Sequence, residues 1–482
     1  MSKVVKRNIQ KTFRLIDFND KYEGEDRNKF YIQMFGINEL GETCSIIIDD
    51  YEPFFYLSVG DDWGEREVKL LNDEIMKKMK YGSLKTEIVK HKKLYGFTGG
   101  KEFKFVKLTF ENTMLMNKVK YLCENKYYKF KKEKLYLYES NIPPLLRYFH
   151  INKISPSGWI QINVTKAKKI EEKITTCKYE YMTKSKYIVP LPEKETIVPY
   201  KICSYDIEAS SSHGDFPVPI KYYKRLAMNI YDIYNILKPK KEQIKDMLKK
   251  IILTAFEYGK FEGVDKVYPK EKYTKLKIEK LIKDLLDMDT EDEDVAKNIE
   301  NIRTLDDMFE KMKDEDEEDN NFVKKNKKRE NDSKTTIIDL LENKEILREE
   351  KIIKLDGMLT QLFPRLEGDK VTFIGSTFMN YGDKEPELNH CLVLGDCDKI
   401  DGIVVESCKT EEELLIKWRD LILQEDPDII IGYNIFGFDY EFMYRRAQEN
   451  HCETEFLKIS RNRDEQWWKL KDGEITIENT KV

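Results

Sequence analysis

Apolar and polar residues alternate in short runs along residues 1–198, which is the period expected of half-buried strands. Phe103–Phe110 (FKFVKLTF) is one such run, and residues 30–59 contain two strand-like runs followed by an aromatic strand. The aromatic and lysine side chains here suit contacts to a single nucleic-acid strand, although an aromatic core beneath a solvated lysine surface is the simpler interpretation. We therefore expect a β-rich domain with some helix over residues 1–198.

The pattern changes between about residues 238 and 352, where Lys, Glu, Asp, Ile and Leu dominate. This segment contains an acidic block, Asp314–Asn321, and a basic block, Lys324–Glu330. Its flanks have helical spacing, whereas the charged blocks are typical of solvated or disordered chain. We interpret the segment as an insertion into a domain that resumes near Asp369. The basic block has the composition of a nuclear-import signal, but a solvated loop explains it more simply.

Alternating strand and helix patterns return after the insertion. Val371–Met379 and His390–Gly395 have the composition of buried strands, and a helix is predicted from Thr410 to Pro427. Asp428–Gly432 is a further short strand of buried type, followed by a tight loop and another helix. The apolar face of the first helix consists of Leu414, Trp418, Leu421 and Ile422. This order predicts one sheet flanked by helices.

Composition limits the class of protein. The chain has 482 residues, of which 40% are hydrophobic, so it is long enough for about two to four folded domains. Its many charges nearly cancel, to a formal net charge of −5, and this balance does not exclude a nucleic-acid partner. The eight cysteines include no C-x-x-C pair, which argues against a disulfide framework or a zinc site. Without a signal peptide or an apolar run of membrane-spanning length, an intracellular, soluble protein is expected.

Two acidic residues, Asp206 and Glu208, stand at the end of the apolar strand that begins at Lys201. Residues two apart in a strand project from the same face, about 7 Å from one another, while Tyr205 and Ile207 project from the opposite face. Two like charges in this arrangement repel, and a divalent cation between them removes the conflict. Mg²⁺ suits such all-oxygen sites, and a pair of ions about 3.5–4 Å apart stabilises both oxygens exchanged at a phosphodiester.

Asp439 is the best candidate for a third acid, because it follows the strand 428–432 and strand ends of one sheet lie close together. Asn434 is expected to fix the preceding loop through its side chain, and Phe438 to offer a stacking surface to a base. An acid pair D-x-E is common by chance and is usually a solvated strand end or a helix cap. Its combination with N-x-x-x-F-D after a second strand is far more specific.

Residues 204–217 (SYDIEASSSHGDFP) and 429–447 (IIIGYNIFGFDYEFMYRRA) resemble the first and second exonuclease motifs of family B DNA polymerases, of the delta-like kind carried by large DNA viruses. Three further stretches, 35–56, 94–108 and 137–162, resemble the N-terminal part of the same family. The resemblance implies an α/β protein, α+β overall. It comprises a β-rich template-binding domain over 1–198 and an RNase-H-like 3′→5′ exonuclease domain with a mixed sheet over 199–482.

By the same resemblance, Asp206 and Glu208 are metal ligands, with Asp206 bridging two Mg²⁺ or Mn²⁺ ions and Asp439 serving the second ion through water. Asn434 and Phe438 are expected to position a frayed primer end. The implied partners are DNA, as a single-stranded 3′ end and a template strand, and a sliding clamp, with no membrane. The implied location is the site of viral DNA replication, either the host nucleus or a cytoplasmic virus factory.

The sequence departs from the family in its last part. The third exonuclease motif of the family has a Tyr and, four residues later, an Asp, yet this chain contains no tyrosine after Tyr444. Motifs of the palm, fingers and thumb are also absent, so we expect the N-terminal part of a polymerase that is inactive alone and relies on a second chain. Three alternatives remain: a stand-alone exonuclease that uses Asp464 or Asp472, a non-catalytic single-stranded DNA-binding or docking module, and a decayed gene fragment.

Overall fold

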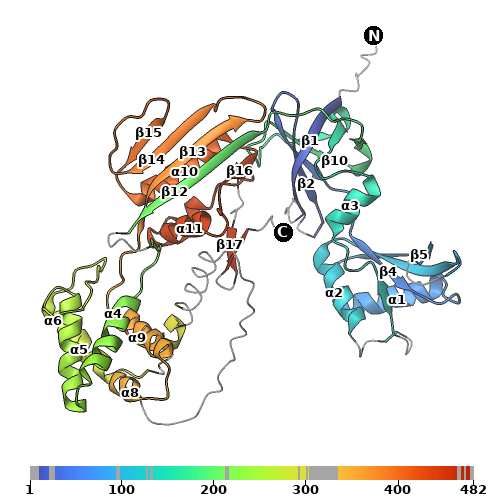
Figure 1. The fold of residues 1–482 in the computed structure, drawn as a ribbon. Coiled ribbons are helices and arrows are strands. Elements are labelled where there is room, and N and C mark those ends of the chain that lie inside the picture. Colours follow the sequence, from blue (N-terminus) through green and yellow to red (C-terminus); the bar gives the residue numbers. More distant parts are fainter. Residues whose placement is uncertain are drawn as a thin grey trace.

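The fold was analysed in a computed structural model of the chain (Figure 1). It describes residues 10–20, 26, 28–93, 98–125, 127, 129–130, 134–211, 216–290, 292, 294–299, 302, 335–463, 468–471 and 474–477. The two charged blocks of the insertion lie outside these residues, as do the alternative acids Asp464 and Asp472. No helix in the described part is both long and apolar enough to cross a membrane.

A seven-stranded sheet forms the first layer of the N-terminal part. Its order is β11-β8-β1-β2-β3-β10-β9, and every residue of the central strand β2 is buried. Helix α3 (Pro144–Asn152) packs on it through Tyr148 and Phe149. The strands are β1 (Gln10–Asn19), β2 (Ile32–Ile37), β3 (Thr43–Ile48), β8 (Trp159–Asn163), β9 (Lys168–Lys169), β10 (Tyr179–Thr183) and β11 (Ile188–Leu191).

A separate four-stranded antiparallel sheet, in the order β5-β6-β4-β7, follows in the N-terminal part. Its elements are β4 (Phe54–Ser58), α1 (Glu65–Met79), β5 (Leu84–Lys92), β6 (Glu102–Phe110), α2 (Thr113–Glu124) and β7 (Tyr136–Tyr138). Both helices lie on one side of this sheet (Figure 1). Leu71 of α1 and Leu115 of α2 share a core with Leu57 and Leu108 of the strands. The run Phe103–Phe110 is therefore the half-buried strand that its alternation predicts.

A mixed five-stranded sheet in the order β15-β14-β13-β12-β16 forms the core of the C-terminal part. Its strands are β12 (Lys201–Ser210), β13 (Lys370–Asn380), β14 (Leu388–Leu394), β15 (Val404–Cys408) and β16 (Ile429–Ile431). β13 is antiparallel to both of its neighbours, β12 and β14, while β15 is parallel to β14 and β16 is parallel to β12. The mixed sheet confirms the predicted fold class.

Three helices share a core with this sheet: α10 (Glu411–Glu425), α11 (Asp439–Glu449) and α12 (Glu453–Phe456). Helix α10 begins where expected, because the Thr410 hydroxyl accepts the Glu413 N–H at 3.2 Å. Its predicted apolar face, Leu414, Trp418, Leu421 and Ile422, is buried. The expectation that 428–432 forms a buried strand is wrong in one respect: Ile429 is 38% and Ile431 47% exposed. β16 is an edge strand, so these side chains lack the cover that a central strand has.

Helices separate β12 from β13. They are α4 (Lys224–Leu237), α5 (Lys241–Ala255), α6 (Lys275–Asp287), α8 (Ile337–Glu342) and α9 (Arg348–Leu362). Their Ile and Leu side chains form a core of their own, in which Ile251, Ile282 and Leu355 are fully or almost fully buried. The flanks of the predicted insertion are thus helical, as their spacing indicates. They pack into one lobe, beside the sheet (Figure 1). A short hairpin, β17 (Trp468–Lys471) and β18 (Glu474–Ile477), follows α12.

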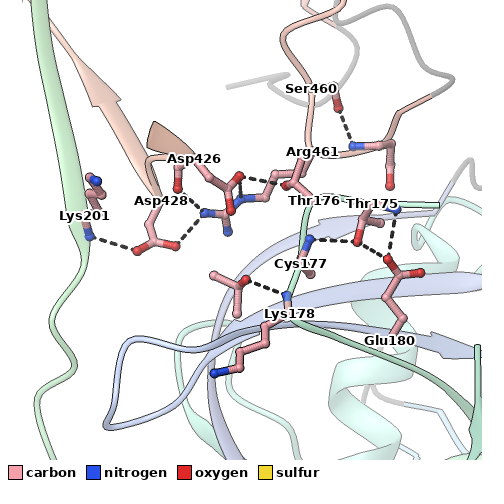
Figure 2. Close-up of polar contacts among 12 residues, drawn as sticks. Thr175, Thr176, Cys177, Lys178, Glu180, Lys201, Asp426, Asp428, Ser460 and Arg461 are labelled. Atoms are coloured by element: carbon pink, nitrogen blue, oxygen red, sulfur yellow. Dashed lines mark hydrogen bonds and ion pairs between the residues drawn. The ribbon is translucent and has the colours of Figure 1, made fainter. Parts of the chain in front are cut away.

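Arg461 joins the mixed sheet to the N-terminal part (Figure 2). Its guanidinium donates to Asp428 Oδ1 at 2.8 Å, and to the side chain and the carbonyl of Asp426 at 3.2 and 3.0 Å. Thr176, which precedes β10, donates its hydroxyl to Asp426 at 2.7 Å and its N–H to the Arg461 carbonyl at 2.9 Å. The second carboxylate oxygen of Asp428 accepts the N–H of Lys201, at the start of β12 (2.9 Å). This joint fixes β12 relative to the seven-stranded sheet.

Candidate functional site

β12 divides its side chains between two environments. Cys203, Tyr205 and Ile207 are buried, whereas Asp206 and Glu208 are exposed on the opposite face. The Tyr205 ring lies between α10 and α11, with ring centroids 4.9 Å from Trp418 and 5.4 Å from Tyr440. This packing holds the strand firmly from one side and leaves its acidic face open, as the period-two pattern predicts.

Asp439 begins α11 and lies against the edge of β12. Its side chain is almost fully buried, at 2% exposure, and its Oδ1 accepts the N–H of Ile207 at 3.3 Å. β16 pairs with β12 only as far as Ser204. Beyond Ser204, β16 no longer supplies hydrogen-bond acceptors to β12. The Asp439 carboxylate therefore accepts the N–H of Ile207 there, in place of a strand carbonyl.

The carboxyl groups of Asp439 and Asp206 are close enough to share a hydrogen bond. Burial, the negative charge of Asp206 and a hydrogen bond shared with it raise the pKa of Asp439 to about 6, while the Ile207 N–H opposes this shift. Among the residues that the structure describes, neither Asp206, Glu208 nor Asp439 forms an ion pair with Lys, Arg or His. A buried carboxylate beside a second acid is costly, and a bound cation relieves that cost.

A tight loop from Gly432 to Phe438 places Asp439. The main chain of Asn434, in a left-handed conformation with φ 49°, accepts the N–H groups of Gly437 and Phe438, each at 3.0 Å. A Cβ at Gly432 would stand 2.8 Å from the Tyr205 carbonyl oxygen, so glycine lets the loop pass close to β12. The expectation that Asn434 fixes the loop through its side chain is not what the structure shows: the carbonyl of Asn434 holds the loop, and its side chain lies over Gly437.

Several aromatic side chains lie on the loop that leads into Asp439 or contact it. The Phe438 ring is half-buried against Phe442 and Phe216, with centroids 5.4 and 5.7 Å away. Phe216 is 49% exposed, Phe436 63% and Tyr433 79%. Sequence reasoning singled out Phe438 but missed the other three. A signal was present, because residues 433, 436 and 438 are aromatic within a loop too short to bury them all.

The donor set fits a divalent cation in part. Carboxylate oxygens are the ligands that Mg²⁺ prefers, and Asp206 and Asp439 offer them without a neutralising side chain. Within the described ranges, however, no group of three or more His, Cys, Asp or Glu side chains is arranged to hold a metal ion. The structure thus brings Asp206 and Asp439 together and leaves Glu208 on the same face but outside a three-residue cluster.

Comparison with known proteins identifies the family. The family model described as "DNA polymerase family B, exonuclease domain" matches residues 135–288 and 309–481. The chain belongs to DNA polymerase family B. The resemblance of its two motifs is thereby confirmed, and the mixed sheet built on β12 is the RNase-H-like core of the exonuclease domain.

Viral DNA polymerases are among its relatives. The DNA polymerase of Phaeocystis pouchetii virus is 37% identical, over 98% of this chain and 50% of that protein. That of Pyramimonas orientalis virus is 33% identical, over 93% of this chain and 37% of that protein. The DNA polymerase delta catalytic subunit of Dictyostelium discoideum is 41% identical over 18% of this chain and 8% of the subunit. The chain spans half or less of the length of these relatives.

Among solved structures, the family B DNA polymerase of the archaeon Pyrobaculum calidifontis aligns with 97% of this chain and 36% of its own length. The TM-score is 0.45 and the sequence identity 11%.

Proposed function

We propose that the chain forms the N-terminal part of a viral DNA polymerase and carries part of its 3′→5′ proofreading site. The observation that supports this most strongly is the buried carboxyl of Asp439 against that of Asp206, with no ion pair to either among the described residues. An uncompensated acid pair at a strand end is unfavourable for folding and useful for holding a cation.

In this proposal Asp206 and Asp439 hold Mg²⁺ or Mn²⁺, and Glu208 joins them from the same face of β12 when DNA is bound. Two such ions, when bound, stabilise the oxygens that enter and leave at a scissile phosphodiester. The protein supplies position: α11 fixes Asp439, and the Ile207 N–H orients its carboxylate. Asp206 is exposed, so the pair is accessible to a substrate from solvent.

The substrate proposed is an unpaired 3′ end of DNA. Phe438, with Phe436 and Tyr433 on the loop beside the acids, offers ring faces to unstacked bases. Asn434 holds the loop in place through its main chain. A mispaired terminus unpairs at low cost, so it reaches such a site more readily than a paired one.

We further propose that these 482 residues alone have little nuclease activity and an incomplete site, because no tyrosine follows Tyr444 and the pattern of the family's third exonuclease motif is therefore missing. Binding of Mn²⁺, followed by electron paramagnetic resonance, tests the acid pair directly. We expect Asp206→Asn and Asp439→Asn to weaken binding about tenfold or more, and Asp428→Asn, whose carboxylate is held by Arg461, to leave it unchanged.

Digestion of a fluorescent single-stranded oligonucleotide tests the activity. Robust Mg²⁺-dependent digestion by the purified chain, lost in Asp206→Ala, would contradict the incomplete site and favour a stand-alone exonuclease. Equal Mn²⁺ binding by wild type and Asp439→Asn would reject the metal site itself.

A second candidate is a non-catalytic module that grips single-stranded DNA, favoured by the exposed rings of Tyr433 and Phe436. It predicts salt-sensitive DNA binding that persists after Asp206, Glu208 and Asp439 are all replaced. Loss of DNA binding in that triple variant would reject it.

A further inference from the structure

The edge strands of the three larger sheets differ in how they are shielded. An edge strand leaves main-chain N–H and C=O groups unpaired, and proteins usually shield it with proline, with lysine or by keeping it short. β7, β9 and β16 have only two or three residues, β11 contains Pro190, and β5 contains three lysines. β15 is longer than the short edges and contains neither lysine nor proline. Among the described strands of these sheets, it is therefore the edge left open.

The main-chain groups of β15 alternate between its neighbour and the open side. The Cys408 carbonyl accepts the Gly395 N–H at 2.8 Å, so the main-chain groups of Cys408 face β14. Because these groups point to opposite sides at successive residues, those of Val405 and Ser407 face away from β14. No described strand lies on that side. Each of these two residues therefore offers one N–H and one C=O to an added strand.

Apolar side chains gather at the same edge. Ile400 is 49% exposed, Ile403 37% and Val404 51%. Side chains branched at Cβ are suited to packing against those of a neighbouring strand. The one charge within β15, Glu406, is held towards α10 by Lys417 at 2.7 Å, so it leaves the outer side of the strand accessible.

Negative charge surrounds these side chains. Residues 396–406 contain four acids and one lysine. Asp396, Asp398 and Asp401 are exposed, and within the described ranges none of the three forms an ion pair with Lys, Arg or His. Asp396 stands beside the open edge, because it accepts the hydroxyl of Ser407 at 3.3 Å. Such an edge attracts a cationic strand, whereas a second copy of β15 would bring the same acids against one another.

We propose that β15 is a docking edge for an extended, basic peptide segment of a partner protein, which adds a strand to the five-stranded sheet. Val405 and Ser407 supply the main-chain hydrogen bonds, the exposed Ile and Val side chains contact alternate apolar residues of the segment, and the acids attract its cationic ones. Strand addition of this kind takes affinity from the main chain and specificity from alternate side chains. β13 and β14 separate β15 from β12 (Figure 1), so the site does not depend on the proposed nuclease function.

Fluorescence anisotropy of labelled nine-residue peptides, with the full chain, tests the proposal. The probe alternates lysine with valine and suits an extended strand. A peptide of alternating glutamate and valine reverses the charge, and one of alternating lysine and proline keeps the charge but lacks every second main-chain donor. We expect only the lysine–valine peptide to bind, with an affinity that falls as salt is added.

Variants of the edge separate main-chain pairing from charge. Ser407→Pro removes an outward N–H and should weaken binding of the lysine–valine peptide roughly tenfold. Asp398→Asn/Asp401→Asn should weaken it about fivefold and reduce its dependence on salt. Glu193→Gln/Glu195→Gln is the matched control, because it removes two exposed charges from the N-terminal part and should have no effect.

Losses in both edge variants, with the control unchanged, would support the docking edge. Equal binding of the lysine–proline peptide would mean that charge alone attracts the probe and would overturn the proposal. No binding by the wild type, unchanged affinity in Asp398→Asn/Asp401→Asn or an equal loss in the control would also overturn it. If Ser407→Pro alters the circular dichroism spectrum, the double Asp variant and the lysine–proline peptide decide instead. A dimer in sedimentation velocity that Asp398→Asn/Asp401→Asn strengthens would assign the edge to a second copy of the chain and reject the basic peptide.

Discussion

Two buried acids contact β12 at different points, Asp428 at Lys201 and Asp439 at Ile207, and they differ in whether a cation neutralises them. The Asp428 side chain is 3% exposed and is held by Arg461 at 2.8 Å and by the Lys201 N–H. Asp439 is 2% exposed, but its neighbour is the carboxylate of Asp206. The side chains of Asp428 and Asp439 are about equally buried, but Asp428 pairs with an arginine and Asp439 lies beside another acid. Burial alone therefore does not identify a functional acid.

The difference shows how to separate structural from functional carboxylates in this fold. Folding gains nothing from placing two like charges together, whereas it gains from the Arg461 joint, which ties two sheets. An acid that remains without a protein cation is therefore a candidate for ligand binding, as proposed for Asp206 and Asp439. We therefore expect the neutralised acids to control stability and the unneutralised pair to control binding.

The largest effect on stability is expected at Arg446 with Glu411, the most deeply buried ion pair among the described residues, whose side chains are both 2% exposed. Arg446→Met would leave Glu411 buried without a cation, at a cost of about 3–5 kcal/mol in the free energy of unfolding. Urea denaturation measures it. Lys458→Met, which removes an exposed pair with Glu455, should cost at most about 1 kcal/mol. A cost below that of the control would contradict the assignment.

Arg461→Leu should have the next largest effect, about 1–3 kcal/mol, because Asp426 and Asp428 lose their shared partner. The Thr176 amide, which donates to the Arg461 carbonyl, should also exchange its hydrogen faster. Lys178→Leu is a control in the same joint, since its pair with Glu42 is exposed. Unchanged exchange at Thr176 would mean that Arg461 does not hold the two sheets together.

Sequence reasoning found the acid pair because strand period fixed Asp206 on one face and topology brought Asp439 to the neighbouring strand end. It could not find the Arg461 joint, whose partners lie 33 and 35 residues away and follow no period. The two-residue period of a strand shows which face a side chain is on, but not how far it lies from another side chain. In addition, the pairing of β12 with β13 shifts register between Glu208 and Ala209. The D-x-E pattern in the sequence does not predict this register shift.

The helices show the same limit. Ile and Leu positions in 238–352 predict helical flanks, but high charge hid the fact that they share one core with residues outside those bounds, such as Leu226 of α4. In the N-terminal part, alternation identified Phe103–Phe110 as a strand. It did not reveal that two helices cover one face of the sheet that contains this strand. The alternation of apolar and polar residues does not determine the spatial order of the strands.

Asp439→Asn should stabilise the metal-free chain above pH 6, by about 1–3 kcal/mol. The carboxyl has a pKa of about 6 in the folded chain against 3.8 when unfolded, so the native state binds more protons between these values. Stability of the wild type therefore falls as pH rises from about 4 to 6, and the variant escapes this loss. Thermal unfolding across pH 4–8 measures the gap, which should vanish at pH 4 and reverse when saturating Mn²⁺ binds the wild type. A gap independent of pH would show that Asp439 is not the titrating group.

Glu208→Gln should change stability least, by no more than about 0.5 kcal/mol, because the side chain is exposed and forms no ion pair among the described residues. If Glu208 joins Asp206 and Asp439 around a cation, the same variant should still weaken Mn²⁺ binding about tenfold. Glu412→Gln, an exposed acid on α10, should alter neither quantity. Unchanged Mn²⁺ affinity in Glu208→Gln would restrict the site to the two acids that the fold itself brings together, and the comparison with Asp428 would then apply to that pair only.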